Sequence, residues 1–111
     1  MANIYKNSFY SPTTVAGTTV YTCNATARAV IQNIQITNSS GNKIVQASIY
    51  DNSASTTYLI SYANITGPTI CNIAKGPIIL EENDSLILES SSTTNVNGVI
   101  SILEINRGLA E

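Results

Sequence analysis

The stretch GPIILEENDSLIL, residues 76–88, holds the densest group of carboxylates in a chain with only seven acidic residues. Glu81, Glu82 and Asp84 stand close enough to bind a cation, or to serve as an acid and a base if their pKa values are driven apart. An EF-hand calcium loop needs a central glycine, which EENDSLILESS lacks. A turn would instead use Asn83 and Asp84 to cap the backbone. We therefore expect a structural turn whose acids face water or a neighbouring subunit, with cation binding and catalysis as the alternatives.

Other chemistry is scarce. The chain has no histidine, which removes the commonest general base, the usual catalytic triads and imidazole metal ligands. Cys23 and Cys71 lack the two further ligands of a zinc site, and each lies among apolar, strand-forming residues. We expect buried, unpaired thiols rather than a disulfide. The sequence thus predicts no enzyme, no catalytic or metal-binding residue and no cofactor.

Length and composition limit the number of domains and the kinds of partner that the chain can have. A chain of 111 residues fits one domain, residues 1–111. Charged residues make up 11%, against about 25% in an ordinary soluble domain, and the five basic residues are scattered, so we expect no nucleic-acid partner. The N-terminus lacks the apolar core of a signal peptide, and no apolar run approaches a membrane span. We expect synthesis in the cytoplasm without export, and no membrane partner.

Short runs rich in Ile, Val, Thr and Tyr, broken by Asn, Ser, Gly and Pro, predict an all-β domain with little or no helix. In NSSGN, Gly41 and Asn42 stand where a hairpin needs positive φ. The N-terminal ten residues form either a first strand or an arm that reaches a neighbour. About eight strands favour a two-sheet antiparallel sandwich, jelly-roll or immunoglobulin-like. They are expected at residues 3–10, 18–23, 28–37, 43–51, 57–63, 69–73, 85–90 and 98–106, with PIIL (77–80) as a further short strand.

Alternation along the strands predicts which side chains enter the core. The expected core residues are Val30, Ile34, Ile36, Val45, Ala47, Ile49, Leu86, Leu88, Val99, Leu103 and Ile105. Apolar residues are left over on the opposite faces, and we interpret them as an oligomer or assembly interface. That set is Ile31, Ile44, Ile87, Ile100 and Ile102. A bulge that flips part of a strand, or scattered surface isoleucines, is the alternative.

Six tyrosines stand among Asn and Thr, a composition that suits sugar binding by ring stacking. In TTYLISYA, alternation places Tyr58, Ile60 and Tyr62 on one face. Packing is the preferred interpretation, and glycan binding remains the alternative.

Several segments, taken in order, carry a resemblance to a known family. They are the start MANIYKN, the stretch TTVYTCNATARAVIQNIQITNSSGN, the segment GPIILEENDSLIL and the ending ISILEINR. Together they resemble the small β-sandwich virion proteins of tailed bacteriophages over nearly the whole chain. One departure is that Cys23 and Asn24 stand where the family commonly has an apolar residue and proline.

The resemblance implies a non-enzymatic structural protein of the virion, in the first place a capsid decoration (cement) protein that docks on the shell as an oligomer. A neck or tail component for connection or fibre attachment, and a glycan- or receptor-binding tail module, are the alternatives. The implied partners are further copies of the chain, in a trimer or ring, and the major capsid protein or neck and tail proteins.

Overall fold

The computed structural model describes residues 2–106, which form nine strands and no helix. The predicted all-β class is confirmed, and each predicted strand has an observed counterpart whose ends differ by three residues at most. The strands are β1 (Ala2–Tyr10), β2 (Thr18–Thr22), β3 (Ala27–Asn38), β4 (Asn42–Asp51), β5 (Thr56–Thr66), β6 (Thr69–Asn72), β7 (Ile78–Leu80), β8 (Ser85–Ser90) and β9 (Val96–Asn106).

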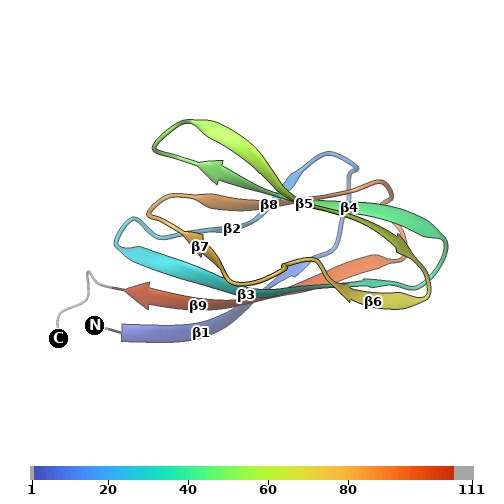
Figure 1. The fold of residues 1–111 in the computed structure, drawn as a ribbon, viewed down its shortest axis with the longest axis horizontal. Coiled ribbons are helices and arrows are strands. Elements are labelled where there is room, and N and C mark those ends of the chain that lie inside the picture. Colours follow the sequence, from blue (N-terminus) through green and yellow to red (C-terminus); the bar gives the residue numbers. More distant parts are fainter. Residues whose placement is uncertain (1, 107–111) are drawn as a thin grey trace.

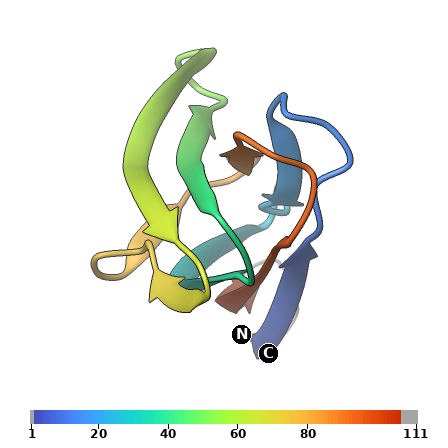
Figure 2. The ribbon, with the colours of Figure 1, turned by 90° about the vertical axis from the view of Figure 1, so that its right-hand side faces the viewer.

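The strands form two antiparallel sheets that pack face to face (Figures 1 and 2). Sheet A has the order β1-β9-β3-β6, with β7 also paired to β3, and sheet B has the order β2-β8-β4-β5. The short strands β6 and β7 pair with different parts of β3 and together make one interrupted strand. Each sheet sets an early strand beside a late one, which is the double Greek key of a jelly roll rather than an immunoglobulin-like order.

The N-terminal segment is the first strand of the domain's own sheet. β1 pairs with β9 in continuous register from Ala2 opposite Asn106 to Tyr10 opposite Gly98. The alternative of an extending arm is therefore not what the structure shows. The hairpin predicted in NSSGN is wrong: β3 and β4 belong to different sheets and do not pair, so this turn carries the chain from sheet A to sheet B. Gly41 has the predicted positive φ, at 77°, whereas Asn42 does not.

The core lies between the two sheets and matches the prediction on β4 and β8. Val45, Ala47, Leu86 and Leu88 are fully buried, and Ile49 packs against them from the end of β4. In both strands, strict alternation carries the inward positions without interruption through the core.

A bulge in β3 corrects part of the prediction. Ile31 pairs with Ile102 and Asn33 pairs with Ser101, so Gln32 is an extra residue with no partner of its own. The bulge shifts the alternation by one residue. On the C-terminal side of the bulge, Ile34 is buried as expected. On the N-terminal side, Ile31 is buried instead and Val30 points outward.

The faces of β9 are the reverse of the predicted ones. Ile100 and Ile102 are buried, whereas Val99, Leu103 and Ile105 are half-buried on the outer face of sheet A. Both faces of this strand carry large apolar residues, so alternation alone does not choose between them. Glu104 shares the inner face with Ile100 and Ile102, and its hydrogen-bond partners offset the cost of burying its carboxylate there.

Candidate interaction surfaces

The acidic stretch forms a turn between β7 and β8, as predicted. Asn83 has a φ of 69°, the left-handed conformation that asparagine tolerates. The carboxylate of Asp84 accepts hydrogen bonds from the backbone N–H groups of Asn52 and Glu81, each at 3.0 Å. Asp84 is only 6% exposed, so the expectation that it faces water is wrong. Each of its two carboxylate oxygens accepts one backbone N–H, and the pair of bonds holds two loops together.

The other two acids of the turn pair with an arginine at the surface. Arg28 Nε lies 3.2 Å from Glu82 Oε1, and Arg28 Nη1 lies 3.8 Å from Glu81 Oε2. Within residues 2–106 there is no group of three or more His, Cys, Asp or Glu side chains that could hold a metal ion. The geometry of the acids therefore supports a structural turn.

A buried polar network, which sequence reasoning missed, lies where β1, β2 and β9 meet. Tyr21 donates a hydrogen bond to Glu104 Oε2, and Asn106 Nδ2 donates one to Glu104 Oε1 at 3.2 Å. Lys6 Nζ lies 3.8 Å from Glu104 Oε2 and 5.8 Å from the centre of the Tyr21 ring. The hydrogen bond from Tyr21 holds the pKa of Glu104 below its ordinary value, whereas burial and that same contact raise the pKa of Tyr21. The inward carboxylate is therefore ionised and satisfied.

Both cysteines are free thiols, as predicted, but only Cys23 is buried; Cys71 is half-buried. Cys23 is 1% exposed, and its Sγ points at the backbone carbonyls of Ala27 and Leu80, at 3.4 and 3.8 Å. Burial raises the pKa of Cys23, and the nearby carboxylates of Glu104 and Asp84 raise it further. A buried thiol kept protonated in this way is a small core residue, not a nucleophile.

An apolar row crosses the outer face of sheet A. Tyr5 pairs with Leu103, Leu103 pairs with Val30, and Val30 pairs with Ile79, so the four side chains form one line across four strands. We call these four residues the outer row. Tyr5 is 75% exposed and Ile79 is 59% exposed, while the two central residues are half-buried. No element among the described residues covers the row.

The surroundings of the outer row are weakly charged. The next line of residues on one side is Asn7, Ser101 and Asn33, all polar and uncharged. On the other side, Ile105 lies between Asn3 and Arg28, and Arg28 is paired with the acids of the turn. The row therefore has the character of a contact surface, with apolar residues inside a polar rim.

The predicted interface residues do not form this surface. Ile31, Ile100 and Ile102 are buried in the core, so their placement on an outer face is wrong. The bulge in β3 accounts for Ile31, and in β9 both faces are apolar, so alternation could not choose between them. Ile44 and Ile87 do lie on the outer face of sheet B and are half-buried. The β1–β2 loop approaches Ile87 so closely that a Cβ on Gly17 would lie 2.9 Å from its Cγ2. The prediction of left-over apolar surface holds, but different residues provide it.

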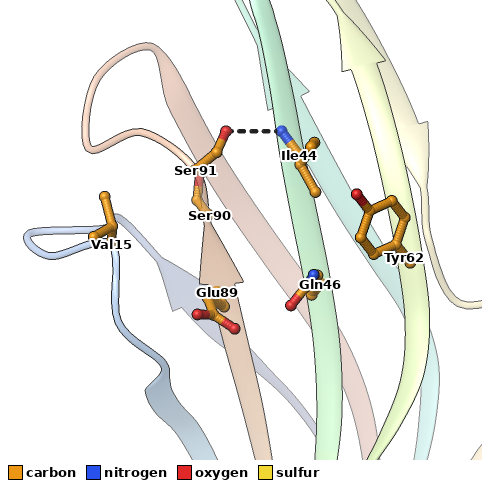
Figure 3. Close-up of a pocket in the computed structure, with 7 residues that line it drawn as sticks. All are labelled: Val15, Ile44, Gln46, Tyr62, Glu89, Ser90 and Ser91. Atoms are coloured by element: carbon orange, nitrogen blue, oxygen red, sulfur yellow. Dashed lines mark hydrogen bonds between the residues drawn. The ribbon is translucent and has the colours of Figure 1, made fainter.

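A groove of about 430 Å³ lies on the outer face of sheet B (Figure 3). Glu89 of β8 pairs with Gln46 of β4, and Gln46 pairs with Tyr62 of β5, so these three side chains form a line across the groove. Ile44 and Val15 supply apolar walls, and Ser91 Oγ is held by the backbone N–H of Ile44 at 2.9 Å. The groove is open and presents an aromatic ring beside two polar side chains.

A second bulge corrects the prediction for the tyrosines. Ala47 pairs with Ser61 and Ser48 with Leu59, so Ile60 is an extra residue in β5. Tyr62 lies opposite Gln46 on the outer face, whereas Tyr58 lies opposite Ile49, which packs against the core. The two tyrosines are therefore on opposite faces of sheet B and cannot form one binding surface.

Comparison with known proteins supports the fold alone. No protein-family model and no curated protein matches the sequence. A chain in the solved structure of infectious bursal disease virus, Gx strain, is similar in structure, with a TM-score of 0.51 and 14% identity. The match covers 98% of the present chain and 32% of the viral chain, so the present chain spans about a third of its length. None of residues 2–106 belongs to a helix that is long and apolar enough to cross a membrane.

Proposed function

We propose that the protein is a non-enzymatic structural component of a tailed-phage virion, in the first place a decoration protein that docks on the capsid shell as an oligomer. Three findings support this proposal. The ordered motifs resemble those of small phage virion proteins, the jelly roll has a counterpart in a virus structure, and an outer sheet face is apolar and uncovered.

The outer row is the observation that carries the proposal. Its four side chains project from β1, β9, β3 and β7, all of which are hydrogen-bonded into one sheet. A surface on a rigid sheet loses little conformational entropy on docking, and burying apolar side chains stabilises the contact by about 25 cal/mol per Å². A net charge of −2 also keeps repulsion low between copies that are held close together.

The proposal is tested with charge substitutions in the outer row. Tyr5→Lys and Ile79→Lys alter exposed ends of the row, so the fold should tolerate them. Light scattering should show an oligomer for the wild type and a smaller species for both variants. Binding to shells of the encoding phage that lack this chain should be stoichiometric for the wild type and at least about tenfold weaker for the variants. Thr57→Lys, which adds the same charge at an exposed position in β5, is the control.

A wild-type protein that is strictly monomeric and has no affinity for such shells would contradict a decoration role. Density for the chain in an intact particle then gives its position. Density at the neck or tail would replace decoration with a connector or tail role, whereas its absence from the particle would overturn the virion proposal altogether.

A further inference from the structure

We propose that the groove on the outer face of sheet B binds a neutral hexopyranose, as a single residue or as part of a glycan. This inference does not depend on the virion role, because the groove and the outer row lie on different sheets. The ligand class follows from the side chains that meet in the groove and from their charges.

The aromatic side of the groove is Tyr62. Its side chain is 60% exposed, and Figure 3 shows the ring on β5 at one margin of the groove, beside Ile44 and Gln46 of the neighbouring strand. A tyrosine ring presents a flat apolar face and a polar tip. A hexopyranose has the matching features, an apolar C–H face that can stack on a ring and hydroxyl groups at its edge.

The polar side of the groove is the pair Gln46 and Glu89. Because neighbouring strands lie about 4.8 Å apart, the line Tyr62–Gln46–Glu89 extends over about 9.6 Å, with the amide one strand and the carboxylate two strands away from the ring. A sugar stacked on Tyr62 would direct its hydroxyl groups along this line. Within residues 2–106 neither polar side chain makes a hydrogen bond or an ion pair, so both are available to a ligand. A carboxylate accepts two hydroxyl hydrogens, and an amide both donates and accepts.

The charge of the groove selects against acidic sugars. Among the described residues that line the groove, Glu89 is the only charged one, and none is a lysine or an arginine. An acidic sugar would bring its carboxylate toward Glu89 without a compensating cation, which disfavours binding. The volume of about 430 Å³ lies within the range of small-molecule sites, roughly 300–1,000 Å³.

The test is a titration of the ¹⁵N-labelled protein with the methyl glycosides of glucose, galactose, mannose and N-acetylglucosamine, followed by an array of neutral and sialylated glycans. We expect saturable shifts at Ile44, Gln46, Tyr62 and Glu89 with at least one neutral sugar. Tyr62→Ala should weaken that binding by about tenfold, equivalent to about 1.4 kcal/mol, whereas Tyr62→Phe should retain most of it. Glu89→Gln should weaken it less than Tyr62→Ala does.

Tyr58→Ala is the matched control, because Tyr58 lies on the opposite face of the same strand and should leave binding unchanged. The proposal is overturned if no neutral sugar gives saturable shifts, if Tyr62→Ala binds as tightly as the wild type, or if Tyr58→Ala weakens binding equally. A preference for sialylated over neutral glycans would also overturn it. Shell binding and oligomeric state report on the outer row, so they can fail while sugar binding succeeds, and the converse also holds.

Discussion

The most consequential single residue in the interior is Glu104. An ionised carboxylate turned toward an apolar core is strongly unfavourable unless it is paired and hydrogen-bonded. Glu104 has Tyr21 and Asn106 as hydrogen-bond donors and Lys6 as a nearby cation. With these partners in place, the inner face of β9 can contain a glutamate and still pack against the opposite sheet.

We expect Tyr21→Phe to lower the free energy of unfolding by about 1–3 kcal/mol at pH 7, because it leaves a buried carboxylate without its main donor. The pKa of Glu104 is lower in the folded chain than in the unfolded chain. Its stabilising contribution is therefore complete above about pH 4.3, the ordinary glutamate value, and is lost as the pH falls through the lower folded value. Urea unfolding at pH 7 and at several acidic pH values measures both effects.

Glu104→Gln is the control for the pH dependence, since it occupies the same space and cannot ionise. We expect a shallower loss of stability in acid for Glu104→Gln and for Tyr21→Phe than for the wild type. Identical acid profiles for all three proteins would show that Glu104 does not couple folding to pH.

Asp84 and Glu82 should differ sharply although they stand two positions apart. Asp84→Ala removes the acceptor for the backbone N–H groups of Asn52 and Glu81, and we expect a loss of about 1–3 kcal/mol. Glu82→Gln alters a pairing with Arg28 at the surface, and exposed ion pairs contribute about 0–1 kcal/mol. Urea unfolding of both variants measures the difference. A large loss from Glu82→Gln would indicate that the acidic turn has a role beyond structure.

At the scale of elements, β9 offers a direct test of which face is buried. Ile102 is 1% exposed in the core, and its neighbour Leu103 is half-buried on the outer face. We expect Ile102→Ala to cost about 2–5 kcal/mol and Leu103→Ala to cost less than half as much in the isolated protein. Denaturant unfolding at a concentration where the protein is not assembled measures both. The opposite ranking would mean that Leu103, not Ile102, lies in the core.

The strands themselves could be predicted from the sequence because β-branched runs and turn residues are local signals. Regular alternation then placed Val45 and Leu86 correctly. The faces of β3 and β5 could not be predicted, because each has one extra residue, Gln32 and Ile60, that no compositional signal marks. The faces of β9 could not be predicted either, because both carry large apolar residues and the donor that makes a buried Glu104 tolerable, Tyr21, stands 83 positions earlier in the chain.

The candidate surfaces could likewise be predicted from the sequence only in part. Left-over apolar surface was foreseeable from the number of large apolar residues, but its location depended on the bulge in β3. Tyr62 was identifiable as a possible sugar-binding residue, whereas its companions Gln46 and Glu89 come from other strands and are brought beside it by the pairing of β4. The type of surface was therefore easier to predict than its members.

For the whole molecule, the jelly roll provides two outward sheet faces with different chemistry. The face of sheet A carries the apolar outer row, which suits contact with another protein, and the face of sheet B carries a groove with an aromatic ring and polar groups. Because the two sheets are back to back, one face can be covered by assembly while the other stays open. A subunit docked through the outer row would thus present its groove outward.

The two cysteines report on the cooperativity of this sandwich. Cys23 is enclosed between the two sheets and its raised pKa keeps it protonated, whereas Cys71 is half-buried on β6, at the edge of sheet A. We expect iodoacetamide to modify Cys71 in the native protein and to reach Cys23 only when the sandwich opens.

In a Cys71→Ala variant, the rate of alkylation at Cys23 should rise with urea in parallel with the unfolded population, if opening and closing are fast relative to alkylation. Mass spectrometry of the alkylated chain measures both sites, with the Cys23→Ala variant as the control for Cys71. Modification of Cys23 in native buffer as fast as that of Cys71 would show that the region around β2 and the acidic turn opens independently of the rest of the fold.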